Sequence, residues 1–139
     1  MPSVYEKYRL KPVINASGRM TILGVSTPEQ EVVDAVNFGL GHYFEVKDLV
    51  NKTGAYLAEL LGVEDAVVVS CASAGIAQSV AAVIVRGDPY RLEQLHAHAH
   101  DVPSDIVLPK GHNVNFGAPV GTMVNLGGGR VVEAGYANE

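Results

Sequence analysis

The residues best suited to chemistry form a small-residue turn, Ser70–Gly75, between an apolar run and an Ala-rich stretch. The β-branched run of residues 66–69 predicts a strand, and the pattern of residues 75–86 predicts a helix. A turn from a strand into a helix points several backbone N–H groups at one spot, and the helix dipole makes that spot attractive to anions. Small side chains also let a ligand approach the main chain closely. The turn is therefore a candidate phosphate site, with ordinary strand-to-helix packing as the alternative.

Three histidines at alternating positions form a second candidate site. On an extended segment, His96, His98 and His100 would point the same way, so they could hold a metal ion with Asp101 nearby. This pattern suggests a small metal-binding module as one alternative. The simpler interpretation is a solvated loop with incidental histidines, and we assign no metal site.

Two single residues also have chemistry to offer. Cys71 lies at the turn, where a helix dipole lowers a thiol pKa, but the sequence places no general base beside it, and we interpret it as structural. His112 follows a predicted strand and could stack on a planar ligand or transfer a proton. A structural hydrogen bond is the alternative for His112.

The elements that position these residues alternate between strand and helix from residue 66 onward. We expect strands at 66–69, 105–108 and 131–134, joined by helices at 75–86 and 118–126, with a brief helix at 90–95 and then a loop. This order predicts a mainly parallel α/β sheet, in which ligands gather at the carboxyl ends of the strands. Both the turn and His112 would lie at that edge.

The first part of the chain reads as helical. We expect helices at 3–10, from 27 onward and at 45–61, the last ended by Gly62. For the middle helix, Thr27 is the predicted cap, with Gln30 completing a capping box. Its predicted buried face consists of Val32, Val33 and Val36.

Composition and charge restrict the function. The chain has 139 residues, a net charge of −5 and no basic stripe, which argues against nucleic-acid binding. It has one cysteine, so an internal disulfide is excluded. No apolar run approaches the length of a membrane span. We expect a cytoplasmic protein.

Five stretches of the chain carry a resemblance to a known family: Val13–Gly24, Leu57–Gly62, Val67–Ala77, Lys110–His112 and Leu126–Arg130. In this order they resemble fold type I pyridoxal-phosphate enzymes, specifically the family of selenocysteine synthase (L-seryl-tRNA selenium transferase) and D-glucosaminate-6-phosphate ammonia-lyase. The ammonia-lyase branch matches better, because selenium transferases usually carry Arg-Gly-Glu in place of Lys110-Gly111-His112.

This resemblance implies a fold, a cofactor and site residues. The fold would be an N-terminal segment, 1–45, followed by the truncated first part of a cofactor-binding α/β domain of the aspartate-aminotransferase type, 46–139. Pyridoxal 5'-phosphate would be the cofactor, with His112 against its ring. The substrate would be a small amino acid or amino-sugar acid, and the enzyme would be a homo-oligomer, a dimer in the simplest case. The phosphate would be held by Ala72, Ser73, Ala74 and Gly75, and the substrate would be bound by Asn15, Arg19 and Thr21.

The resemblance also implies a lyase or transferase that works through an aldimine of its substrate. The lysine that binds the cofactor covalently, and the aspartate that pairs with the pyridine nitrogen, lie in later segments of the family, and Lys110 is not that lysine. We therefore expect this chain to be an N-terminal portion that is inactive alone. The alternatives are a fragment of a selenium-transferase-like enzyme and a non-catalytic fragment that binds phosphate or a partner.

Overall fold

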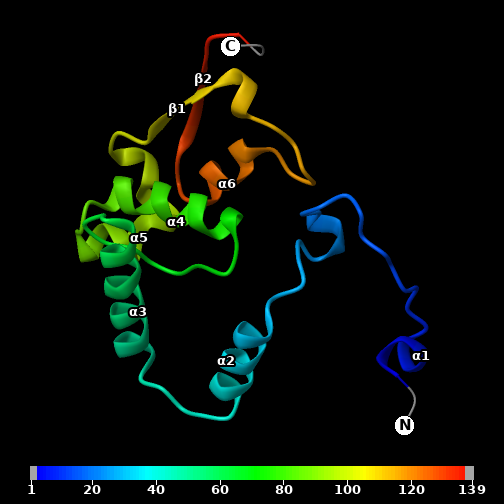
Figure 1. Ribbon diagram of the computed structural model, residues 1–139. Coiled ribbons are helices and arrows are strands. Elements are labelled where there is room, and N and C mark those ends of the chain that lie inside the picture. Colours follow the sequence, from blue (N-terminus) through cyan, green and yellow to red (C-terminus); the bar gives the residue numbers. More distant parts are fainter. Residues whose placement is uncertain (1–2, 137–139) are drawn as a thin grey trace. The chain divides into compact units, whose positions relative to one another are not determined.

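The computed structural model describes residues 3–136, so residues 1–2 of the expected N-terminal segment and residues 137–139 of the expected α/β domain lie outside the described part. The chain divides into two compact units, residues 1–48 and residues 49–139 (Figure 1). The secondary structure is mostly helical, with one small parallel sheet. This agrees with the α/β class in its coarse form.

The first unit begins with a short, well-capped helix. Helix α1 (Val4–Tyr8) is preceded by Ser3, whose hydroxyl accepts from the Glu6 backbone N–H at 3.2 Å. The Glu6 carboxylate accepts in return from the Ser3 backbone N–H at 2.7 Å. This reciprocal pair is a capping box, and it stabilises a helix too short to form alone. After a loop, a 3-10 helix η1 (Thr21–Leu23) follows.

Helix α2 (Gln30–Leu40) starts later than predicted. Its cap residue is Glu29, and the predicted Thr27 capping box is wrong. The Gln30 side chain instead donates to Asp34 Oδ1 at 2.8 Å, one turn further along the helix. It therefore does not bond to the Thr27 backbone N–H, as a capping box requires. The predicted buried face is also wrong, because no residue of α2 is buried and Val32 and Val36 are 51% and 55% exposed.

Helix α3 (Val46–Leu61) confirms the predicted helix, and Gly62 ends it with a φ of +67°. Its buried residues are small, Gly54 and Ala58. A Cβ on Gly54 would collide with the carbonyl oxygen of Ala66, so the chain that follows α3 packs directly on its backbone. The large apolar residues of the predicted stripe are mostly exposed: Val46, Leu49, Val50, Tyr56, Leu60 and Leu61.

The predicted strand at 66–69 is wrong. These residues are irregular, and Val67 and Val68 are 60% and 63% exposed. A strand is stabilised by hydrogen bonds to a neighbour. In residues 3–136 the sheet contains only β1 and β2, and residues 66–69 pair with neither of them. The β-branched composition of these residues is therefore not accompanied by strand pairing.

Helix α4 (Ala72–Val85) begins three residues earlier than predicted, so the small residues of the turn already form its first turn. Cys71 is the extended cap residue. Helix α5 (Pro89–His98) is longer than the brief helix predicted, and a 3-10 helix η2 (Ala99–Asp101) follows it. Asp88 caps α5 by accepting from the Tyr90 backbone N–H at 2.9 Å.

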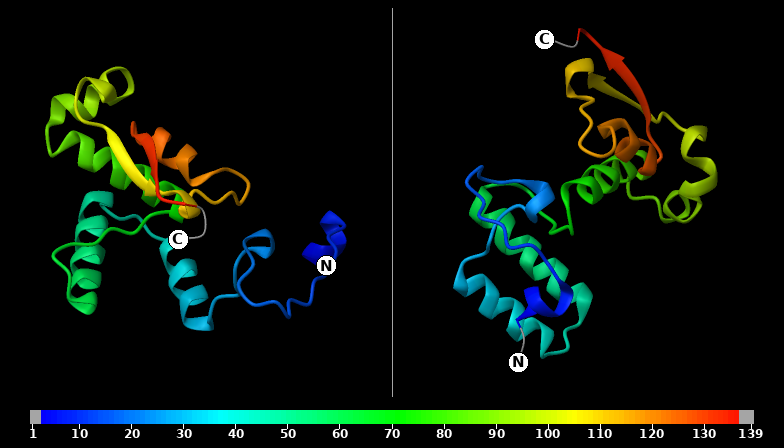
Figure 2. Two further views of the ribbon diagram at one scale, coloured as in Figure 1. Left: turned by 90° about the horizontal axis from the view of Figure 1, so that it is seen from above. Right: turned by 90° about the vertical axis from the view of Figure 1, so that its right-hand side faces the viewer.

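The sheet consists of strands β1 (Asp105–Pro109) and β2 (Arg130–Ala134), which run parallel as predicted. Between them lie the 3-10 helix η3 (Lys110–His112) and helix α6 (Val120–Leu126). Ile106 pairs with Val131 in the register. Figure 2 shows the two strands side by side, with α6 running close to them.

The core of the second unit lies between α4, α6 and the sheet. Val80, Ile84 and Val124 are buried, and Ile106 and Val131 pack against them. The chain after α6 lies very close to the backbone of α4, because a Cβ on Gly127 would collide with the Ala77 carbonyl oxygen. Glycine at this position is thus required by backbone packing. No helix within residues 3–136 combines the length and apolar character needed to cross a membrane.

Candidate functional site

The first turn of α4 carries the candidate phosphate site. The first helical hydrogen bond runs from the Gly75 backbone N–H to the Cys71 carbonyl, at 3.0 Å. The N–H groups of the three preceding residues, Ala72, Ser73 and Ala74, therefore have no carbonyl partner within the helix. Ala72 and Ser73 are exposed, and their side chains are too small to cover the main chain. The turn can accept an anion from solvent.

Cys71 belongs to the same turn. Its thiol is exposed. The backbone N–H of Ala74 and the hydroxyl of Ser70 lower the pKa of the Cys71 thiol, and the Ser73 backbone N–H adds a smaller effect. Cys71 makes no side-chain capping hydrogen bond to α4, but its thiolate would compete with another anion for the Ala74 and Ser73 N–H groups. The direction of this pKa shift agrees with a turn whose N–H groups favour negative charge.

Gly75 has a packing role beside any role in binding. A Cβ at this position would lie 3.3 Å from Val69 Cγ2, tighter than an ordinary contact. The segment before α4 therefore lies against the first turn of the helix at this point. The preceding segment is not a strand, so the sheet-edge argument applies to His112 and not to the turn.

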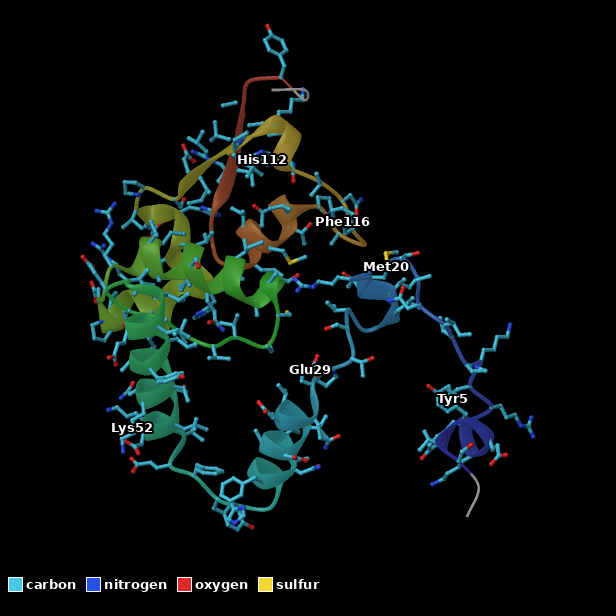
Figure 3. The ribbon with its side chains drawn as sticks, viewed as in Figure 1. Tyr5, Met20, Glu29, Lys52, His112 and Phe116 are labelled. Atoms are coloured by element: carbon cyan, nitrogen blue, oxygen red, sulfur yellow. The ribbon has the colours of Figure 1, made fainter. Side chains whose placement is uncertain are left out.

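His112 ends the 3-10 helix η3, directly after β1, at the carboxyl end of that strand. Its side chain is exposed (Figure 3). The next residue, Asn113, makes hydrogen bonds to both α6 and β2. His112 is thus an exposed imidazole on an anchored turn.

The predicted substrate residues lie in the first unit. The Asn15 side chain is engaged locally: its Nδ2 donates to the Gly18 carbonyl at 2.6 Å, and its Oδ1 accepts from the Ser17 backbone N–H at 3.0 Å. Arg19 is exposed, and Thr21 opens η1. The structure brings Asn15, Arg19 and Thr21 into one loop segment, while Ala72–Gly75 and His112 share the second unit.

The extended arrangement predicted for the three histidines is wrong. His96 and His98 are in α5 and His100 is in η2, so adjacent members of the run project in different directions. His98 Nδ1 lies 2.6 Å from Asp101 Oδ2, and His100 Nδ1 lies 3.0 Å from Ser104 Oγ. Throughout the described chain, no group of three His, Cys, Asp or Glu side chains is arranged to hold a metal ion.

An ion pair marks the opposite end of the strands. Arg130 Nε donates to Asp105 Oδ1 at 2.6 Å, joining the first residues of β1 and β2. This hydrogen bond, together with the positive charge of Arg130, holds the pKa of the Asp105 carboxyl below its ordinary value. Both side chains are partly exposed, so the pair contributes little to stability at high salt.

Sequence reasoning missed Asn113 as part of the site. Its contacts reach Gly121 and Glu133, eight and 20 positions away, and no spacing rule connects such residues. One available signal is Pro119 before α6, since its side chain has no polar group to cap a helix. A cap from elsewhere in the chain was therefore to be expected.

Comparisons with known proteins give several matches, among them two curated relatives and a solved structure. The chain is 45% identical over 137 residues to D-glucosaminate-6-phosphate ammonia lyase of Salmonella typhimurium, covering 99% of this chain and 37% of the relative. It is 38% identical over 136 residues to 5'-C-glycyluridine monooxygenase-decarboxylase of a Streptomyces species, covering 97% and 34%.

A solved structure of D-glucosaminate-6-phosphate ammonia-lyase matches with a TM-score of 0.90 at 45% identity, covering 98% of this chain and 37% of that one. No family model matches the sequence. The chain thus spans just over a third of the length of the curated relatives it matches. Over nearly its whole length, this chain is homologous to D-glucosaminate-6-phosphate ammonia-lyase.

Proposed function

We propose that this chain forms the phosphate-binding part of a pyridoxal-phosphate site in an enzyme resembling D-glucosaminate-6-phosphate ammonia-lyase. The observation that carries the proposal is the open first turn of α4, Ala72–Ala74, in a chain 45% identical to that lyase along nearly its whole length. Three N–H groups without helical partners, small side chains and the positive helix end suit a phosphate group.

The second relative supports a binding role for this part of the chain. A monooxygenase-decarboxylase and an ammonia lyase differ in the reactions their names state, yet both match over almost all of this chain. A stretch shared by different reactions is better explained by a shared ligand than by reaction-specific chemistry. We infer that the shared ligand is the cofactor.

The residues present fit this cofactor. The N–H groups of Ala72, Ser73 and Ala74 would hold its phosphate, and Gly75 would keep the turn close to the preceding segment. His112 would lie against the planar ring and could hold a proton there. When bound, pyridoxal phosphate serves as an electron sink for bond cleavage at the substrate's α-carbon.

The first unit would provide substrate contacts in the same proposal. Arg19 offers a guanidinium for a carboxylate, and Thr21 offers a hydroxyl. Asn15, engaged with Gly18 and Ser17, would act by holding the loop in shape. The substrate would be a small amino acid or amino-sugar acid, and the enzyme would be a homo-oligomer.

The Cys71 thiol gives a direct test of the phosphate site. We expect pyridoxine 5'-phosphate to slow the alkylation of Cys71 by iodoacetamide, because the bound phosphate would compete for the same N–H groups and repel the thiolate. Pyridoxine, which lacks the phosphate, should have no effect at the same concentration. Neither compound carries an aldehyde, so neither can react with surface lysines.

Two matched substitutions sharpen this test. Ser73→Asp places a carboxylate in the first turn, where it favours the helix but repels a phosphate, so protection should be lost while the fold is kept. Ser79→Asp makes the same change at an exposed position further along α4 and should leave protection intact. Equal protection by pyridoxine and its phosphate, or full protection in Ser73→Asp, would contradict the proposed site.

A further inference from the structure

The side chain of Asn113 joins three elements of the second unit. Its Oδ1 accepts from the Gly121 backbone N–H at 2.9 Å, and its Nδ2 donates to Glu133 Oε1 at 2.7 Å. Gly121 lies in the first turn of α6, and Glu133 lies near the end of β2. Asn113 itself directly follows η3 and is half-buried.

The bond to Gly121 supplies a missing helix cap. Pro119 is the cap residue of α6 and makes no side-chain hydrogen bond, so the Gly121 N–H would otherwise lack an acceptor. The approach is close enough that a Cβ on Gly121 would lie 3.3 Å from Asn113 Oδ1. Glycine at 121 therefore gives the amide of Asn113 room to reach the helix.

The bond to Glu133 explains why the residue is an amide. A carboxylate at 113 would accept from Gly121 equally well but would repel Glu133, whereas an apolar residue would make neither bond. Only an acceptor and a donor on one short side chain satisfy both partners. Asn113 thereby connects the chain leaving β1 with the carboxyl-terminal part of β2.

This connection restrains the turn that carries His112. The turn is attached to β1 at Pro109, and at its other end Asn113 is tied to α6 and β2. The Asn113 backbone N–H also donates to the Lys110 carbonyl at 3.3 Å, which closes the turn. His112 lies between these two anchored points.

We propose that Asn113 is a positioning residue, whose side-chain amide fixes the turn Lys110–His112 and so orients His112 at the carboxyl edge of the sheet. The inference rests on the proposed function for the ligand that His112 faces. The restraint on the turn does not depend on that ligand.

The first experiment measures the restraint without a ligand. In Asn113→Ala, amide hydrogen exchange at Gly121 should accelerate, and the NMR order parameter of the His112 backbone should fall. Asn115→Ala is the matched control, because Asn115 Oδ1 accepts from the Gly117 N–H at 3.0 Å, only two residues along the chain. That variant should leave both readouts near their wild-type values.

Swapping the amide and the carboxylate between positions 113 and 133 provides a rescue experiment. Asn113→Asp should loosen the turn, because its carboxylate faces Glu133. The double substitution Asn113→Asp/Glu133→Gln restores one donor and one acceptor and should recover the slow exchange at Gly121. Unchanged exchange in Asn113→Ala, or no recovery in the double variant, would overturn the proposal.

The second experiment asks whether the restraint acts through His112. Asn113→Ala should weaken binding of pyridoxine 5'-phosphate by about 2- to 10-fold, the range for one or two hydrogen bonds. In a His112→Ala background, the same substitution should have no further effect. A merely structural role would weaken binding equally in both backgrounds, and that result would overturn the positioning role.

The two hypotheses can fail separately. If pyridoxine 5'-phosphate does not bind the wild-type chain, the proposed function fails, while the exchange data still decide whether Asn113 restrains the turn. If the ligand binds but amide exchange at Gly121 is the same in the wild-type chain and in Asn113→Ala, the proposed function stands and the proposed role of Asn113 is wrong.

Discussion

The two units of this chain use their apolar residues differently. In residues 49–136, Val80, Ile84 and Val124 are buried between two helices and a sheet. In residues 3–48 no residue is buried, although Val32, Phe38 and Leu40 are apolar and lie in or beside a helical pattern. The first unit is instead held by local hydrogen bonds, such as the Ser3–Glu6 capping box and the Asn15 turn. The periodicity of apolar residues predicts a helix, but whether those residues are buried depends on the elements that pack against that helix.

The largest expected contrast between the units comes from removing a core side chain. Ile84 is 2% exposed, so Ile84→Ala should lower the free energy of unfolding by about 2–5 kcal/mol. Ile22 in the first unit is 87% exposed, and Ile22→Ala should change the free energy of unfolding by less than about 0.5 kcal/mol. Urea denaturation followed by circular dichroism measures both. Similar losses of unfolding free energy for the two substitutions would contradict the difference in burial between the two units.

Glycine substitutions should give a smaller contrast, with opposite signs. Gly127→Ala would bring a Cβ against the Ala77 carbonyl and within 2.8 Å of Val80 Cβ, and should cost about 1–3 kcal/mol. Gly39 lies inside α2 with nothing within 4 Å of its Cβ position, so Gly39→Ala should stabilise the helix by about 0.5–1 kcal/mol. Thermal melts of the two variants should shift in opposite directions. A stabilised Gly127→Ala would contradict the close packing after α6.

The smallest effect is expected at the Asp105–Arg130 pair and depends on pH. Because the pKa of Asp105 is lowered in the folded chain, the pair stabilises the fold above the ordinary carboxyl pKa, and this stabilisation is lost as the pH falls through the lowered value. Asp105→Asn should therefore be less stable than wild type at neutral pH and equal to it in strong acid. Chemical denaturation at a series of pH values, at low salt, measures the difference. A difference in stability between wild type and Asp105→Asn that grows as the pH falls would contradict a lowered pKa for Asp105.

Sequence reasoning did well where the signal is local. The helix at 46–61 ends at the predicted glycine, and the parallel strands at 105–109 and 130–134 lie close to the predicted ranges. It failed where the outcome depends on distant partners. Residues 66–69 have strand composition but pair with neither strand of the sheet in residues 3–136. The histidine run is a separate, local failure, because α5 continues to His98, past the predicted helix end at residue 95.

The candidate site shows the same division. The small-residue turn was identified from composition alone, although it turned out to be the first turn of α4 itself. Asn113 was not identified, because its partners Gly121 and Glu133 become neighbours only when α6 and β2 are in place. Residues whose roles depend on long-range contacts need the fold before they can be recognised.

The central claim is that the first turn of α4 binds a phosphate group, and the backbone N–H groups of Ala72, Ser73 and Ala74 report on it directly. In a titration followed by ¹⁵N–¹H NMR, pyridoxine 5'-phosphate should shift these three amide resonances in a saturable manner, and pyridoxine should not. Shifts at His112 with the same saturation curve would connect the phosphate and ring ends of one ligand. If the phosphate compound leaves the resonances of Ala72–Ala74 unmoved while the protein is folded, the proposed site is wrong.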